Sequence, residues 1–233
     1  MTQTSNAVTQ SSQDPQTETV IYLKSGSIML ALGLLIAGFA AAFAPWVWRP
    51  PVALQLTGPG LAEFVKFLPQ VRTGQLQGER LFFLLPLMVV IISLPLFSGS
   101  RQLYLPGWLR WTMRLSVLPL ALATLSPVWT PGILLAAEFR LQTVMVGLAL
   151  GLTLISPLLG GIPLRILGWL FVAAGLAALV LPYWQFSLVQ AQIQEAYHEP
   201  VSLGWGWWLT ALGMVVSMAG AIIATIFSTK AFS

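Results

Sequence analysis

The sequence contains no cysteine, a single histidine and very few charged residues. Only 8% of its 233 residues are Asp, Glu, Lys or Arg, whereas soluble domains carry about 25%. The absence of cysteine excludes disulfide bonds, thiolate metal sites and a cysteine nucleophile. His198 stands alone, and no HExxH, P-loop or GxSxG motif is present. We therefore expect no cofactor, no metal site and no enzymatic activity.

Long apolar runs make up most of the chain, which is 57% hydrophobic. Several runs approach the roughly 20 apolar residues that a helix needs to cross a bilayer. So many runs leave too little polar surface to cover a soluble globule. The predicted fold is an all-α integral membrane protein with a six-transmembrane-helix bundle. The expected spans are residues 25–47, 81–97, 109–128, 131–159, 166–189 and 204–227.

The two ends of the chain are polar. Residues 1–24 are rich in Thr, Gln and Ser and show no apolar period, which predicts a disordered tail. Residues 25–229 form the expected membrane domain, and residues 230–233 form a short C-terminal tail. The net charge of +4 is spread over several loops. This distribution indicates contact with lipid headgroups and does not suggest nucleic acid binding.

The longest polar segment between two spans, residues 48–80, is expected on the outer side of the membrane. Its residues 59–68 have the apolar spacing of one helix face, with Pro59 suited to the first turn, Thr57 as a cap and Pro69 as a stop. The apolar positions of this face are Leu61, Phe64, Val65 and Leu68. Two interpretations remain open: a docking surface for a partner or an anionic lipid, or a lid over the outer end of the hairpin.

Four charged residues are the candidate functional or interface residues. Glu63 and Lys66 lie on the polar side of the short amphipathic helix. Glu138 and Arg140 lie at the start of the span expected over residues 131–159, closest to the hydrocarbon. Because they are two residues apart on a helix, Glu138 and Arg140 point in nearly opposite directions and cannot pair directly. They could be interfacial, or buried with a functional role.

Basic residues and tryptophans predict the orientation. The segment 98–114 contains Arg101, Arg110 and Arg114 and no acid, so it is expected in the cytoplasm. Six spans then place both termini in the cytoplasm, in a cell (cytoplasmic) membrane. Tryptophan prefers the headgroup level, and the residues expected to be anchors at the outer interface are Trp46, Trp48, Trp129, Trp184, Trp205, Trp207 and Trp208.

Two repeated patterns bear on packing and architecture. The pairs Gly33/Ala37 and Gly38/Ala42 are each four residues apart, as in helix-packing faces or in ordinary membrane-helix composition. In addition, a Pro-Gly pair precedes Ala-Glu-Phe in residues 59–64 and again in residues 131–139. Three tandem helical hairpins would explain this echo, and so would the general preference of membrane interfaces for Pro and Gly.

Two functions fit the sequence. The first is a non-enzymatic accessory or scaffold subunit of a membrane complex, in contact with membrane lipids and another membrane or peripheral subunit. The second is a small permease, or the membrane subunit of a transporter that a partner chain energises. Prolines inside the spans favour the second function modestly, because transporters use broken helices; these prolines are Pro86, Pro95, Pro119 and Pro157.

Overall fold

The computed structural model describes residues 15–49, 54–74, 79–125, 129–198 and 200–231. About 81% of the structure is helical. Five of the described helices are long and apolar enough to cross a membrane. They are α1 (Pro15–Phe43), α4 (Arg80–Gly99), α7 (Ala137–Ile155), α8 (Leu164–Tyr197) and α9 (Trp205–Ala231). An all-α protein of the membrane type is therefore the fold.

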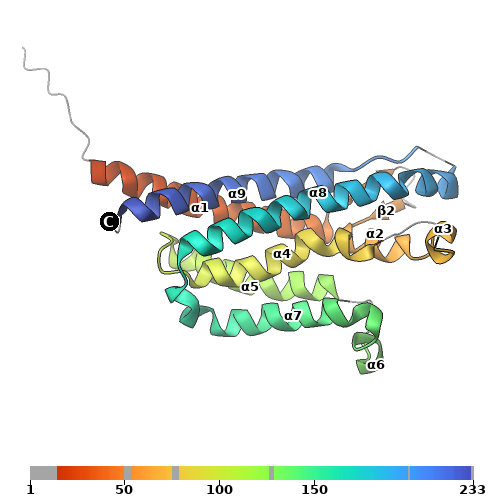
Figure 1. Cartoon of the computed structure of the whole chain (residues 1–233), viewed down its shortest axis with the longest axis horizontal. Helices are drawn as coiled ribbons and strands as arrows, with labels where there is room; N and C mark the ends of the chain where they lie inside the picture. The colour runs from red at the N-terminus through yellow and green to blue at the C-terminus, as the bar shows by residue number, and fades with distance from the viewer. Residues whose placement is uncertain (1–14, 50–53, 75–78, 126–128, 199, 232–233) are drawn as a thin grey trace, which may run out of the picture.

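The third expected span is the weakest of the six. It corresponds to α5 (Gly107–Thr124), which has 18 residues and is not among the five candidates. Helix α5 lies beside α4 (Figure 1), but Arg110 and Arg114 fall in its first half. These charges lower its hydropathy, so the fold does not confirm six spans.

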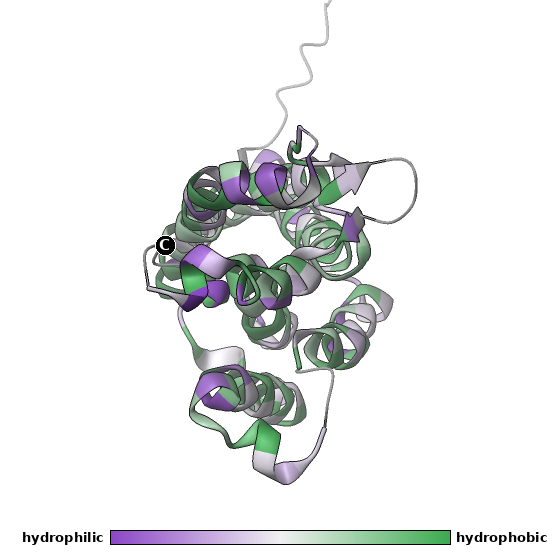
Figure 2. Ribbon diagram, turned by 90° about the vertical axis from the view of Figure 1, so that its right-hand side faces the viewer, coloured by the Kyte–Doolittle hydropathy of each residue, from purple (hydrophilic) through white to green (hydrophobic). Residues whose placement is uncertain are grey.

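Helix α4 is the centre of the bundle and packs against α1, α2, α5, α7 and α8. In its apolar window 72% of the residues are buried, against 22% for α7 and 33% for α8. Pro86 and Pro95 lie inside α4 and are both buried. Helix α4 thus has other helices on several sides, whereas α7, the lowest long helix in Figure 1, lies at the edge of the bundle when it is seen end-on (Figure 2).

Helices α1 and α9 are antiparallel neighbours along their whole length (Figure 1). Glycines allow their backbones to approach closely: a Cβ atom on Gly33 would lie 2.5 Å from the backbone nitrogen of Ser217, and one on Gly213 would lie 2.6 Å from that of Ala37. Gly33 and Ala37 thus form the helix-packing face that their spacing indicated. At one end of the pair, the rings of Tyr22 and Phe227 stack with their centroids 4.9 Å apart.

Several expected boundaries are corrected. Helix α1 begins at Pro15, so residues 15–24 are helical and not disordered; residues 1–14 lie outside the described residues. The expected span over residues 131–159 is divided into α6 (Pro131–Leu134), α7 and the 3-10 helix η1 (Ser156–Gly161). Helix α8 continues through the polar segment after residue 189, and α9 extends to Ala231 into the expected C-terminal tail. The apolar pattern missed these ends because polar residues can extend a helix beyond the hydrocarbon.

The segment between α1 and α4 folds into a compact outer cover. Strands β1 (Val47–Arg49) and β2 (Leu54–Leu56) pair antiparallel, and Val47 also bridges to Leu203. Two short helices follow, α2 (Gly58–Val65) and α3 (Pro69–Arg72). The expected cap is confirmed, because the Gly60 N–H donates to the Thr57 hydroxyl oxygen at 3.2 Å. Pro69 does more than stop α2, since it begins α3.

The apolar face of α2 is turned into the bundle. Leu61, Ala62 and Val65 are fully buried, and α2 packs on α4 and α1. This burial matches the interpretation as a lid, and it means that the apolar face of α2 is not available to a partner. We call the end of the bundle that carries α2 the outer end, and the end where α1 begins and α9 ends the inner end (Figure 1).

Two of the seven tryptophans expected as outer anchors are inside the protein. Trp46 and Trp207 are 1% and 3% exposed, and their rings meet edge to face with centroids 4.9 Å apart. They pack the segment that follows α1 against the start of α9 and lie inside the protein, so the anchor prediction is wrong for these two. The other five are exposed, and their anchoring role stays a prediction: Trp48, Trp129, Trp184, Trp205 and Trp208.

Candidate functional site

Four charged side chains from three helices form one cluster at the outer end. Glu63 lies on α2 and Lys66 caps its end, Arg80 is the first residue of α4, and Glu138 lies in the first turn of α7. The Lys66 ammonium lies 2.6 Å from Glu63 Oε2 and 2.7 Å from Glu138 Oε1. Arg80 lies 3.2 Å from Glu63 Oε1 and 3.1 Å from Glu138 Oε1. Two acids and two bases thus neutralise each other, and we call this group the charged cluster.

Arg80 is the buried centre of the charged cluster, with a side chain that is 9% exposed. Its Nη2 also donates to the side-chain oxygen of Gln142, and the Gln142 amide nitrogen donates to the carbonyl oxygen of Thr124. Arg80 therefore connects α4 to α2 and α7, and through Gln142 it reaches the end of α5. An arginine suits this place because its guanidinium stays charged and presents several donors in fixed directions.

An aromatic ring completes the charged cluster from α7. The Lys66 ammonium lies 4.8 Å and the Arg80 guanidinium carbon 4.4 Å from the centroid of the Phe139 ring. Both distances are within the range of cation–π attraction. Phe139 and its neighbour Glu138 thus attract the same two cations, one through its ring and the other through its carboxylate.

The ion pairs shift the pKa values of the two outer members. Hydrogen bonding to the Lys66 ammonium, together with the charges of Lys66 and Arg80, lowers the pKa of Glu138 below its ordinary value despite partial burial. Burial alone would lower the pKa of Lys66, but hydrogen bonds to Glu138 and Glu63 outweigh it and raise the pKa. Both side chains therefore keep their charges around neutral pH.

The structure brings together three of the four candidate residues. Glu63, Lys66 and Glu138 meet in the charged cluster, whereas Arg140 is exposed and forms no ion pair within the described residues. Arg80 was missed as a site residue, because a basic residue just before an apolar run is ordinary for a membrane helix. The echoed Ala-Glu-Phe tripeptides were the available signal, since the glutamates of both copies contact Arg80.

The charged cluster links helices through ion pairs and has no arrangement typical of catalysis. It contains no hydroxyl or thiol nucleophile beside a base. Among the described residues, no group of three His, Cys, Asp or Glu side chains is placed to hold a metal ion. Glu138, at 47% exposure, is its most accessible member and the point where solvent reaches it.

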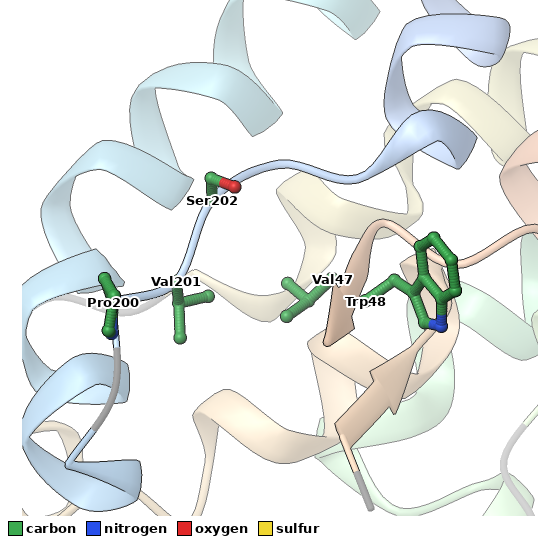
Figure 3. Close-up of a pocket in the computed structure, with 5 residues that line it drawn as sticks. All are labelled: Val47, Trp48, Pro200, Val201 and Ser202. Carbon is green, nitrogen blue, oxygen red and sulfur yellow. The ribbon is translucent and has the colours of Figure 1, made fainter. Parts of the chain in front are cut away.

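A small cavity at the outer end lies between β1 and the segment leading into α9 (Figure 3). Val47, Trp48, Pro200, Val201 and Ser202 line its volume of about 150 Å³. Ligand pockets usually measure roughly 300–1,000 Å³, and none of the described residues that line this one is ionisable. It is therefore a weaker candidate site than the charged cluster.

Comparison with known proteins finds no match: no family model, no curated protein and no solved structure resembles this chain.

Proposed function

We propose that the chain is a non-enzymatic accessory or scaffold subunit of a complex in the cytoplasmic membrane. The observation that supports this proposal is how the charged cluster uses its charges. Each acid is paired with both bases, and the pairs join α2, α4 and α7. A carrier needs charged groups that alternate between partners, whereas a scaffold needs them to fix its helices. The internal neutralisation favours the scaffold.

The exposed side of α7 gives the proposed subunit a surface for a partner helix. Helix α7 packs on α4 and α5 and leaves its other side open. Gly147 and Gly151 lie on this open side, four residues apart, with no atom within 4 Å of where a Cβ would be. In membranes, small residues at this spacing allow a second helix to approach closely. Gly33 and Gly213 already allow such a close approach within the chain, between α1 and α9.

The placement of the first and last helices supports the proposed orientation. Helix α1 begins and α9 ends at the inner end (Figure 1), together with the connection between α4 and α5 that carries Arg101. Basic residues in short connections favour the cytoplasmic side. We therefore propose that the inner end faces the cytoplasm.

The experiment that tests the scaffold proposal is purification of the tagged chain from its native membrane in mild detergent. Mass spectrometry then identifies any protein present in stoichiometric amount. We expect a partner that is lost from the double variant Gly147→Leu/Gly151→Leu and retained by the control Gly132→Leu, which also fills open space but lies in α6. A chain that purifies alone in all three forms would overturn the proposal.

A small permease is the second candidate, and the buried Arg80 at the start of α4 is the observation in its favour. Buried charge beside a helix with two internal prolines is common in transport proteins. For a permease, Glu138→Gln should reduce uptake of its substrate while the purified protein stays folded. Unchanged uptake and growth phenotypes with Glu138→Gln and Arg140→Gln would remove this candidate.

A further inference from the structure

The inner end holds two kinds of arginine, which differ in what their guanidinium groups contact. The Arg110 guanidinium donates hydrogen bonds to backbone carbonyl oxygens. Its Nη1 donates to Ser98 and Ser100 at 2.9 and 2.7 Å, and its Nη2 donates to Leu103 at 2.6 Å. Arg114 donates to the hydroxyl and carbonyl oxygens of Ser98. These two cations cap the end of α4, where carbonyl groups lack helical partners.

Arg101 and Arg165 are the second kind. Both are exposed, and no described acidic side chain forms an ion pair with either. Arg101 lies across Gly160, where an added Cβ would come within 2.7 Å of its Cγ and 3.0 Å of its Nε. A hydrogen bond links the residues next to the two arginines: the N–H of Leu164, beside Arg165, donates to Oε1 of Gln102, beside Arg101, at 2.7 Å. Arg101 and Arg165 therefore flank the same turn, between η1 and α8.

The field at this turn is positive. Helix α8 has 34 residues and begins at Leu164, so its N-terminal partial positive charge adds to the two arginines. Most of the described acids lie toward the outer end: Glu63, Glu79, Glu138 and Glu195. Glu18 lies in the first turn of α1, on the helix that also carries the exposed Lys24. The turn is thus complementary to an anion.

Exposed tryptophans place this turn at the level of lipid headgroups. Trp169 follows Arg165 by one helical turn and is exposed, as are Trp108 and Trp111 at the start of α5. Indole rings favour the region between headgroups and acyl chains. A phospholipid held at this depth by the tryptophans would present its phosphate to the two arginines.

We propose that Arg101 and Arg165, at the turn between η1 and α8, bind the phosphate of an anionic phospholipid. The occupant is a lipid of the leaflet that surrounds the inner end, and charge complementarity with the paired arginines selects it over zwitterionic lipids. This inference is independent of the scaffold proposal, because it concerns a lipid site at the opposite end from the charged cluster.

The test measures lipid binding to the full chain in detergent by native mass spectrometry. The probes are phosphatidylglycerol and phosphatidylcholine with the same acyl chains. We expect selective retention of phosphatidylglycerol, and a loss of affinity of about fivefold for each arginine removed, or roughly 30-fold for Arg101→Gln/Arg165→Gln. Arg140→Gln, an exposed arginine at the outer end, should leave the affinity unchanged.

A further variant separates a built site from general attraction to positive charge. Gly160→Ala keeps every charge but displaces the flexible Arg101 side chain, so we expect it to weaken phosphatidylglycerol binding severalfold. Equal binding of the two lipids would overturn the proposal. So would an equal effect of Arg140→Gln, or saturation by inorganic phosphate in place of the lipid.

Discussion

The Arg80 guanidinium and the Glu138 carboxylate lie 3.1 Å apart and connect α4, the most buried of the five candidate membrane helices, to α7, the most exposed of the five. Arg80 begins α4, and Glu138 lies in the first turn of α7. Helix α7 has neighbours on one side, so this contact fixes its outer end. At the inner end, the backbone of Ser156 occupies the place where a side chain at Gly99 would lie. The helix is thus held at both ends.

Replacing Arg80 with methionine should destabilise the protein strongly. The change leaves Glu63 and Glu138 with Lys66 as the only remaining cation of the cluster, and it leaves the Gln142 side-chain oxygen without its donor. Breaking one side of a buried ion pair costs about 3–5 kcal/mol. We expect a loss of at least about 2 kcal/mol, because part of the cluster is exposed and retains solvent. Denaturant unfolding in detergent measures this difference in the free energy of unfolding between the variant and the wild type.

The matched control for this prediction is Arg140→Met. Arg140 is exposed and outside the charged cluster, so its removal should change the free energy of unfolding by less than about 0.5 kcal/mol. Equal losses for the two variants would show that the charged cluster does not hold α7.

The stability of the protein should fall as the pH is lowered, and Glu138 should account for part of this fall. Because ion pairing lowers the pKa of Glu138 in the folded state, the charged carboxylate stabilises the fold above its ordinary pKa of 4.5. This stabilisation is lost as the pH falls through the lower, folded-state pKa. At the other extreme, the raised pKa of Lys66 stabilises the fold below 10.5 and loses its effect as the pH rises past the folded-state value.

The check is thermal unfolding of the wild type and Glu138→Gln between neutral and acidic pH. The glutamine variant should start less stable and lose less of its melting temperature on acidification. If the two proteins lose the same amount, the ionisation of Glu138 is not coupled to folding.

The sequence predicted the membrane helices well because their signal is local. Hydropathy located the apolar parts of α1, α4, α8 and α9, and the Thr57 cap followed from residue preferences at helix starts. The break between α6 and α7 was not predicted. At that break the Leu134 carbonyl accepts from the Thr143 hydroxyl at 2.8 Å, a contact across a turn that no hydropathy window detects.

The candidate site was predicted only in part: single residues were selected, but their convergence was not. Glu63 and Lys66 could be selected as the polar side of an amphipathic helix, and Glu138 as a scarce charge close to the hydrocarbon. Their convergence depends on how α2 and α7 pack around α4, which is tertiary information. Arg80 illustrates the limit: it was not selected from the sequence, and the structure pairs it with acids 17 and 58 positions away.

The interface between α1 and α9 should be intolerant of larger side chains. A Cβ on Gly213 would lie 2.6 Å from the Ala37 backbone nitrogen, so Gly213→Val must separate the helices. Overpacking of this kind costs about 1–3 kcal/mol or more, because backbone cannot yield as a side chain does. Gly147→Val on α7 is the control, since the space there is open. Equal unfolding midpoints for the two variants would contradict the close packing of α1 and α9.

The number of membrane crossings depends on α5, and the absence of cysteine makes it directly measurable. Single cysteines can be introduced at exposed positions and labelled with a membrane-impermeant maleimide in intact cells. Phe67, after α2, and Leu135, between α6 and α7, are both exposed at the outer end, while Lys24 and Arg165 are exposed at the inner end.

If α5 crosses the membrane, Phe67→Cys and Leu135→Cys should be labelled from outside. Lys24→Cys and Arg165→Cys should be labelled only after the membrane is permeabilised. Labelling of Phe67→Cys without Leu135→Cys would mean that α5 does not carry the chain across, because the two positions would then lie on opposite sides of the bilayer. That outcome would also contradict the charged cluster. Phe67 follows Lys66 and Leu135 lies just before Glu138 in the sequence, and the Lys66 and Glu138 side chains lie 2.7 Å apart.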